Sequence, residues 1–102
     1  MSQDTVRPGP ALLYTRADCP LCFVLRRSAY RAAWRHGLRL RIIDIDVDPN
    51  LRARYDTEVP VLALPDGTTL RGRVSAAEVE MAFTRAAEFL RRPVRGTPGS
   101  DA

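Results

Sequence analysis

Two cysteines, Cys19 and Cys22, are the residues of this chain best suited to chemistry. They are the only cysteines among its 102 residues. In a helix, side chains three positions apart have Cβ atoms about 5–6 Å apart, which is close to the separation that a disulfide requires. The spacing therefore allows the two thiols to form a disulfide with each other and to exchange it with a second molecule.

The elements around the pair predict different roles for the two thiols. Residues 11–14 form a short apolar run typical of a buried strand. Pro20 begins a predicted helix that runs to about His36, and Gly37 is expected to end it. Cys19 then lies at the helix amino terminus, where unpaired N–H groups and the helix dipole favour a thiolate. We therefore expect Cys19 to be the nucleophile and Cys22, one turn later, to be the resolving thiol. Arg16 either adds a fixed positive charge beside them or is an ordinary exposed arginine.

Two other interpretations of the cysteine pair remain open, namely inert buried thiols and half of a zinc site. The chain has one histidine, His36, and no further cysteine to complete a zinc site. A helix rise of 1.5 Å per residue would place His36 about 21 Å from Cys22. We interpret His36 as a solvent-facing residue at the helix end.

The remaining patterns predict an α/β fold with the order β-α-β-α-β-β-α. The capping residues Asp48 and Ser75 begin two further helices, and Glu78 completes a capping box with Ser75. The predicted elements after the first helix are strand 40–47, helix 49–55, strand 60–64, strand 68–73 and helix 76–92. A β-α-β unit is parallel and a hairpin antiparallel, so we expect a four-stranded mixed sheet with helices on both faces.

Composition indicates one domain, because 45% of the residues are hydrophobic and 27% are charged. We expect a flexible segment over 1–10, a folded domain over 11–92 and a disordered tail over 93–102. No apolar run has the roughly 20 residues of a membrane span, and the start lacks the pattern of a signal peptide. We therefore expect a cytoplasmic monomer that does not bind membranes.

The positive charge is interpreted as a general property of the surface. All 16 basic residues are arginines, against 12 acidic residues, and they are spread along the chain. We therefore do not expect nucleic-acid binding. Tyr30, Trp34 and Tyr55 are interpreted as packing residues. The acidic residues of 44–48 lack the pattern of a calcium loop and are interpreted as a polar strand face followed by a helix cap.

Several motifs together resemble the glutaredoxins of the thioredoxin superfamily over about residues 11–92. They are Cys19-Pro20-Leu21-Cys22, the segment 44–49, and Val59-Pro60 followed by an Asp-Gly hairpin. The resemblance implies a thioredoxin/glutaredoxin-like fold with a cis Pro60 beside the cysteines. It also implies a substrate site that the following residues line: Arg16, Pro20, Leu21, Val59, Pro60 and Gly72.

The same resemblance implies how substrate is held. The backbone of Val59 would pair with an incoming peptide or glutathione, and Arg16 would hold a glutathione carboxylate. Leu21 stands where many glutaredoxins carry tyrosine. The Gly-Gly-x-Asp segment that receives the amino end of glutathione is reduced here to residues 72–75, which include no acid.

The function expected from these residues is that of a thiol–disulfide oxidoreductase acting through a mixed disulfide. Its partners would be protein or glutathione disulfides and a reductase system based on glutathione or thioredoxin reductase. No metal and no tightly bound cofactor is expected, with glutathione as a co-substrate. The alternative is a non-catalytic thioredoxin-fold binding module, or an iron–sulfur or metal carrier, that uses the same cysteines.

Overall fold

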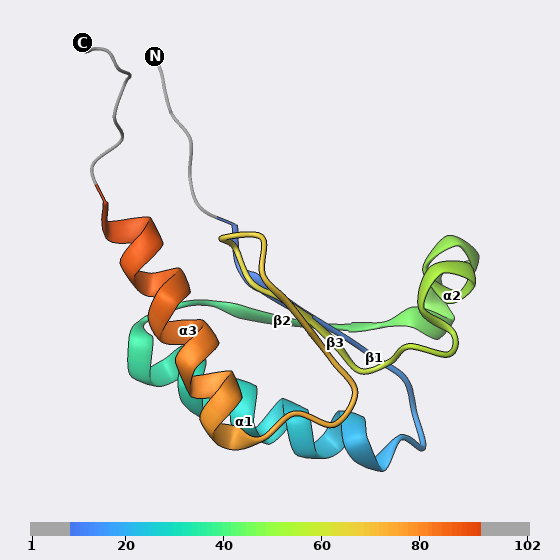
Figure 1. Ribbon diagram of the computed structural model, residues 1–102. Helices are drawn as coiled ribbons and strands as arrows, with labels where there is room; N and C mark the ends of the chain where they lie inside the picture. Colours follow the sequence, from blue (N-terminus) through green and yellow to red (C-terminus); the bar gives the residue numbers. More distant parts are fainter. Residues whose placement is uncertain (1–8, 93–102) are drawn as a thin grey trace, which may run out of the picture.

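The computed structural model describes residues 9–92 (Figure 1). Residues 1–8 and 93–102, which include most of the predicted flexible segment and all of the predicted tail, lie outside the described residues. The elements in chain order are β1 (Ala11–Thr15), α1 (Pro20–His36), β2 (Leu40–Asp44), the 3-10 helix η1 (Ile45–Val47), α2 (Pro49–Tyr55), β3 (Val61–Ala63), β4 (Thr69–Arg71) and α3 (Ala76–Arg91).

The four strands form one mixed sheet in the order β2-β1-β3-β4. β1 and β2 run parallel, with Ala11 opposite Leu40, because α1 carries the chain back between them. β3 is antiparallel to both β1 and β4, and the turn at residues 65–68 joins it to β4. This four-stranded mixed sheet with three helices confirms the predicted fold class.

The main core lies between the sheet and the pair α1 and α3. These two helices pack beside each other on one face of the sheet (Figure 1). Ala11 and Leu13 alternate along β1 and point into this core with no exposed surface, and Leu62 joins them from β3. Phe83 of α3 is the largest fully buried side chain. The core therefore fixes α1 against β1, the strand that leads into the cysteines.

The second face of the sheet is covered near the end of β1 by α2. Tyr14 alternates with Leu13 and so points away from α1 and α3. Its ring stacks on Tyr55 of α2, with the ring centroids 4.4 Å apart. Helices therefore lie on both faces, and the interpretation of Tyr55 as a packing residue is confirmed.

The predicted helix ends are formed by local hydrogen bonds. The Asp48 carboxylate accepts the Asn50 N–H at 2.8 Å, and Ser75 and Glu78 make both bonds of the capping box. Gly37 ends α1 with a left-handed φ of 69°, a conformation that glycine adopts without strain. Among residues 9–92, no helix is both long and apolar enough to cross a bilayer.

The structure corrects three sequence-based interpretations. The strand predicted over 40–47 ends at Asp44, because the Asp44 carboxylate accepts the Asp46 N–H at 2.9 Å and begins η1. His36 does not face solvent freely, since its Nε2 lies 2.5 Å from Glu80 Oε2. Trp34 does not pack in the core, because 87% of it is exposed, and Tyr30 is also exposed.

Candidate active site

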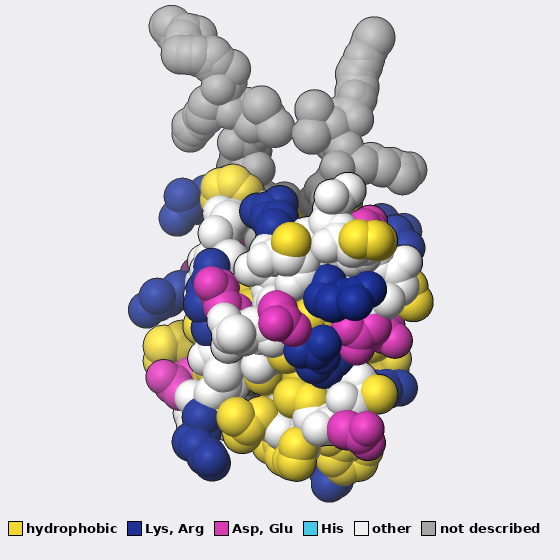
Figure 2. Space-filling view, turned by 90° about the vertical axis from the view of Figure 1, so that its right-hand side faces the viewer, with side chains coloured by type: hydrophobic (Ala, Val, Ile, Leu, Met, Phe, Trp, Pro, Cys, Tyr) yellow, Lys and Arg dark blue, Asp and Glu magenta, His cyan; other side chains and the backbone are white. Residues whose placement is uncertain are grey.

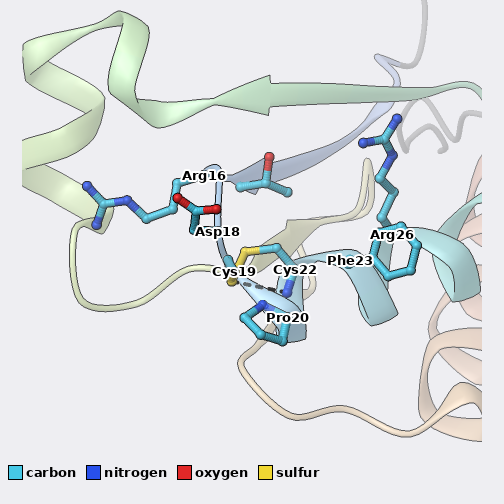
Figure 3. Close-up of a pocket in the computed structure, with 8 residues that line it drawn as sticks. Arg16, Asp18, Cys19, Pro20, Cys22, Phe23 and Arg26 are labelled. Carbon is cyan, nitrogen blue, oxygen red and sulfur yellow. Dashed lines mark hydrogen bonds between the residues drawn. A yellow bond between two sulfur atoms is a disulfide. The ribbon is translucent and has the colours of Figure 1, made fainter.

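The two cysteines lie at the start of α1, after the loop that follows β1. They are joined by a disulfide, with their Cα atoms 5.2 Å apart. Cys19 is the N-cap residue of α1, and Pro20 occupies the first turn, where an N–H would have no helical partner. The Cys19 Sγ accepts a hydrogen bond from the Cys22 N–H at 3.1 Å (Figure 3). The sulfur thus takes the place that a serine or aspartate oxygen usually has at a helix start.

The two cysteines differ in burial. Cys22 is buried, with 3% of its surface exposed, whereas Cys19 remains partly exposed at the surface. Of the two, Cys19 is therefore the one that a second molecule can contact.

A pocket of about 590 Å³ opens beside the disulfide. Figure 2 shows this end of the molecule, with hydrophobic side chains gathered along its lower part and arginine and acidic side chains side by side above them. The pocket brings together four residues that the sequence singled out and four that it did not. Its lining consists of Thr15, Arg16, Asp18, Cys19, Pro20, Cys22, Phe23 and Arg26.

The residues that sequence reasoning missed come from the end of β1, from the loop after it and from the first two turns of α1. Asp18 has a φ of 59°, which aspartate tolerates better than most residues. Phe23 and Arg26 lie side by side on α1 next to the cysteines (Figure 3). The only signal in the sequence was their position one and four residues after Cys22.

Arg16 lines the pocket, but its guanidinium is held by two carboxylates. Nη2 lies 2.8 Å from Asp46 Oδ1, and Nη1 lies 2.6 Å from Asp56 Oδ1. The hydrogen bond to Asp46, followed by that to Asp56, raises the pKa of Arg16. The side chain extends away from the sulfur atoms toward α2 (Figure 3). Its charge is therefore largely neutralised within the protein.

Leu21 and Gly72 line a second pocket of about 520 Å³ between α1 and the loop before α3. Gly72 has a φ of 67° and donates its N–H to the carbonyl of Pro60 at 2.9 Å. The Val59–Pro60 peptide bond is cis, and the Val59 N–H donates to the Tyr55 carbonyl at 3.1 Å. Val59 and Pro60 do not line either of these two pockets.

Within residues 9–92, the structure contains no cluster of three or more histidine, cysteine or acidic side chains arranged to hold a metal ion. Cys19 and Cys22 alone would supply two sulfur ligands. A tetrahedral zinc site takes four ligands, so the remaining ones would have to come from outside the described residues.

Comparison with known proteins identifies the family to which this chain belongs. The glutaredoxin-like domain (DUF836) matches residues 11–84. A crystal structure of a structural-genomics target protein from X. campestris is 31% identical, with a TM-score of 0.62, and the match covers 74% of this chain and 96% of that one. A solution structure of a protein from Nitrosomonas europaea is 25% identical, with a TM-score of 0.57 and coverage of 80% and 98%. No curated protein matches the chain. The chain belongs to the glutaredoxin-like (DUF836) family.

Proposed function

We propose that this protein is a thiol–disulfide oxidoreductase that uses Cys19 as nucleophile and Cys22 as resolving thiol. The observation that carries the proposal is the Cys19 sulfur acting as the N-cap acceptor of α1, 3.1 Å from the Cys22 nitrogen. The same N–H and the positive end of the helix dipole stabilise a thiolate at Cys19 when the disulfide is reduced. A thiolate, not a thiol, attacks disulfides.

The reaction begins with the reduced dithiol. The Cys19 thiolate attacks one sulfur of a substrate disulfide, forms a Cys19–substrate disulfide and releases the other substrate sulfur as a thiolate. The Cys22 thiolate, formed as its proton passes to solvent, then attacks Cys19 Sγ. This step releases the second substrate thiolate and leaves the Cys19–Cys22 disulfide. The two electrons gained by the substrate come from the dithiol, which an external thiol reductant must restore.

The surroundings of Cys19 favour a disulfide on a peptide or protein. The pocket beside it is open and lined by Pro20, Phe23 and Arg26, so that a chain can lie across it. Because the Val59 N–H is already used, we propose that the Val59 carbonyl accepts the hydrogen bond from an extended substrate. Pro60 and Gly72 position this segment, and Leu21 supplies an apolar contact from the neighbouring pocket.

We also propose glutathione as a co-substrate. The Cys19–Cys22 disulfide would be reduced again by glutathione or by thioredoxin reductase, and the protein would act in the cytoplasm. A glutathione carboxylate that bound Arg16 would compete with Asp46 and Asp56. We therefore propose that Arg16 acts mainly as a positioning residue, which ties the loop before α1 to the segments around η1 and α2.

Two variants test the proposed roles. Cys19→Ser is expected to abolish reduction of a disulfide peptide, whereas Cys22→Ser is expected to accumulate a mixed disulfide with the peptide, detected by mass spectrometry. The double variant is the control for non-specific adducts. Wild-type rates in Cys19→Ser, or a trapped adduct on Cys22 instead of Cys19, would exclude the proposed roles.

The alternative of a non-catalytic binding module or an iron–sulfur carrier makes a different prediction for the same preparations. A carrier purified without oxygen would show visible cluster absorption that is lost in Cys19→Ser. A non-catalytic module would leave the disulfide peptide intact while still binding it. Turnover of the peptide with glutathione and its reductase, or with thioredoxin reductase, would favour the oxidoreductase.

A further inference from the structure

Three aromatic side chains of α1 form an exposed row that the fold does not use. Phe23 is 62% exposed, Tyr30 47% and Trp34 87%. At about 100° per residue, these positions fall within about 40° of one another around the helix. The core residues Leu25 and Ala29 point to a different side of α1. We call Phe23, Tyr30 and Trp34, with the arginines Arg26 and Arg27 between them, the α1 stripe.

The charge on this helix has one sign. The sequence from Pro20 to His36 contains no acidic residue. Arg26, Arg27 and Arg31 are exposed, and no ion pair within residues 9–92 involves them. By contrast, Arg35, at the end of the helix, binds Glu80 of α3 at 2.6 Å. The α1 stripe is therefore both apolar and positively charged, and no carboxylate of residues 9–92 forms an ion pair with its arginines.

The stripe is continuous with the candidate active site. Phe23 and Arg26 line the pocket beside the disulfide and lie next to each other on α1 (Figure 3). The Arg26 guanidinium then lies over the Tyr30 ring, 5.7 Å from its centroid. Trp34 lies about 16 Å from Phe23 along the helix. One partner could therefore contact the whole stripe while its disulfide lies at Cys19.

We propose that the α1 stripe binds an acidic protein segment with apolar side chains, adjoining the disulfide that Cys19 attacks. The inference rests on the proposed function. Carboxylates of the segment would pair with Arg26 and Arg27, and its apolar side chains would cover the Tyr30 and Trp34 rings. A nucleic acid would satisfy the arginines, but it carries no disulfide for the adjoining dithiol. The chemistry of the site therefore favours a protein.

Binding can be measured apart from redox chemistry. The probe is a fluorescein-labelled peptide of glutamate, leucine, phenylalanine and serine that contains no cysteine. A second peptide has lysine in place of every glutamate. The acidic peptide is expected to bind at least about tenfold more tightly than the second peptide and to lose affinity as salt rises. Since Trp34 is the only tryptophan of the chain, its emission is expected to change on binding.

Variants locate the binding surface. Trp34→Ala and Arg27→Glu are each expected to weaken binding of the acidic peptide by about tenfold. Phe89→Ala on α3 and Arg41→Glu on β2 change an exposed aromatic residue and an exposed arginine elsewhere, and both variants are expected to bind as the wild type does. Equal affinity for the two peptides, or equal weakening by the control variants, would overturn the proposal. Tighter binding of a 20-nucleotide single-stranded DNA than of the acidic peptide would also overturn it.

A parallel assay separates this inference from the proposed function. Wild-type protein is given a small uncharged disulfide, hydroxyethyl disulfide, with glutathione and its reductase. Failure to reduce it would count against the oxidoreductase, while the peptide-binding result would still decide whether the stripe is a docking surface. Reduction of the small disulfide together with equal binding of both peptides would instead refute only the docking surface.

Discussion

Arg16 and Asp46 form a two-bond ion pair across 30 positions of sequence, with Nη2–Oδ1 and Nε–Oδ2 distances of 2.8 and 3.3 Å. Asp56 binds the same guanidinium through its carboxylate and its backbone carbonyl. This arrangement ties the loop before Cys19 to η1 and to the end of α2. The Arg16 guanidinium is therefore already paired with carboxylates of the protein when no substrate is bound.

Replacement of Arg16 should therefore affect stability more than thiol reactivity. Arg16→Gln is expected to lower the urea concentration at the midpoint of unfolding, because it removes a charge-assisted pair with two-bond geometry. The alkylation rate of Cys19 should change less than about threefold, because the lost charge was already neutralised. Urea denaturation and iodoacetamide kinetics measure the two quantities. Arg31→Gln is the control, and a large fall in alkylation rate in Arg16→Gln alone would show that Arg16 acts directly on the thiolate.

The backbone conformation of Asp18 predicts how substitutions at this position change the stability of the protein. Its φ of 59° lies in the left-handed region, which costs alanine about 1 kcal/mol and glycine very little. Asp18→Ala should therefore be less stable than Asp18→Gly, although glycine is the more flexible residue when unfolded. Thermal unfolding of the two reduced variants checks the order. If alanine proved the more stable, the left-handed conformation would be in doubt.

The core and the α1 stripe should differ sharply in their contribution to stability. Phe83 is fully buried, and Phe83→Ala is expected to cost about 3–5 kcal/mol through lost burial and a cavity. Trp34→Ala removes a larger ring that is mostly in water and should change stability by less than about 0.5 kcal/mol. Chemical denaturation of both variants tests this contrast. A cost above 2 kcal/mol for Trp34→Ala, on the order of a core truncation, would place that ring in a packed interface.

The contact between α1 and α3 should weaken in acid. The hydrogen bond from His36 lowers the pKa of Glu80, and the nearby Arg35 adds to this effect. A lowered pKa in the folded state gives stability that is full above the ordinary value of 4.5 and is lost as the pH falls through the lowered pKa. Glu80→Gln should reduce this acid dependence of the unfolding midpoint below about pH 5. Identical acid profiles for wild type and variant would contradict the assignment.

The sequence predicted the parts of the fold that depend on local signals. The Ser75–Glu78 capping box, Gly37 at the end of α1 and Asp48 at the start of α2 each depend on neighbouring residues, and all three are present. The position of Pro20 likewise placed Cys19 at a helix start. These features need no knowledge of the rest of the chain.

Side-chain contacts between residues far apart in the sequence were not predicted, and neither was one local hydrogen bond that ends a strand. The partners of Arg16 lie 30 and 40 positions away, and that of His36 lies 44 away. The exposure of Trp34 depends on where α1 meets α3 and the sheet, which residue type alone does not determine. Strand β2 ends early because Asp44 bonds to its own backbone neighbour, a competition that alternating hydrophobicity does not reveal.

The pKa of the Cys19 thiol tests the central claim most directly. It can be obtained from the pH dependence of iodoacetamide alkylation in reduced Cys22→Ser, which leaves Cys19 as the only thiol. The helix N-terminal position and the backbone N–H predict a value at least about one unit below the ordinary cysteine value of about 8.5. A value of about 8.5 or higher would contradict an activated nucleophile at the start of α1.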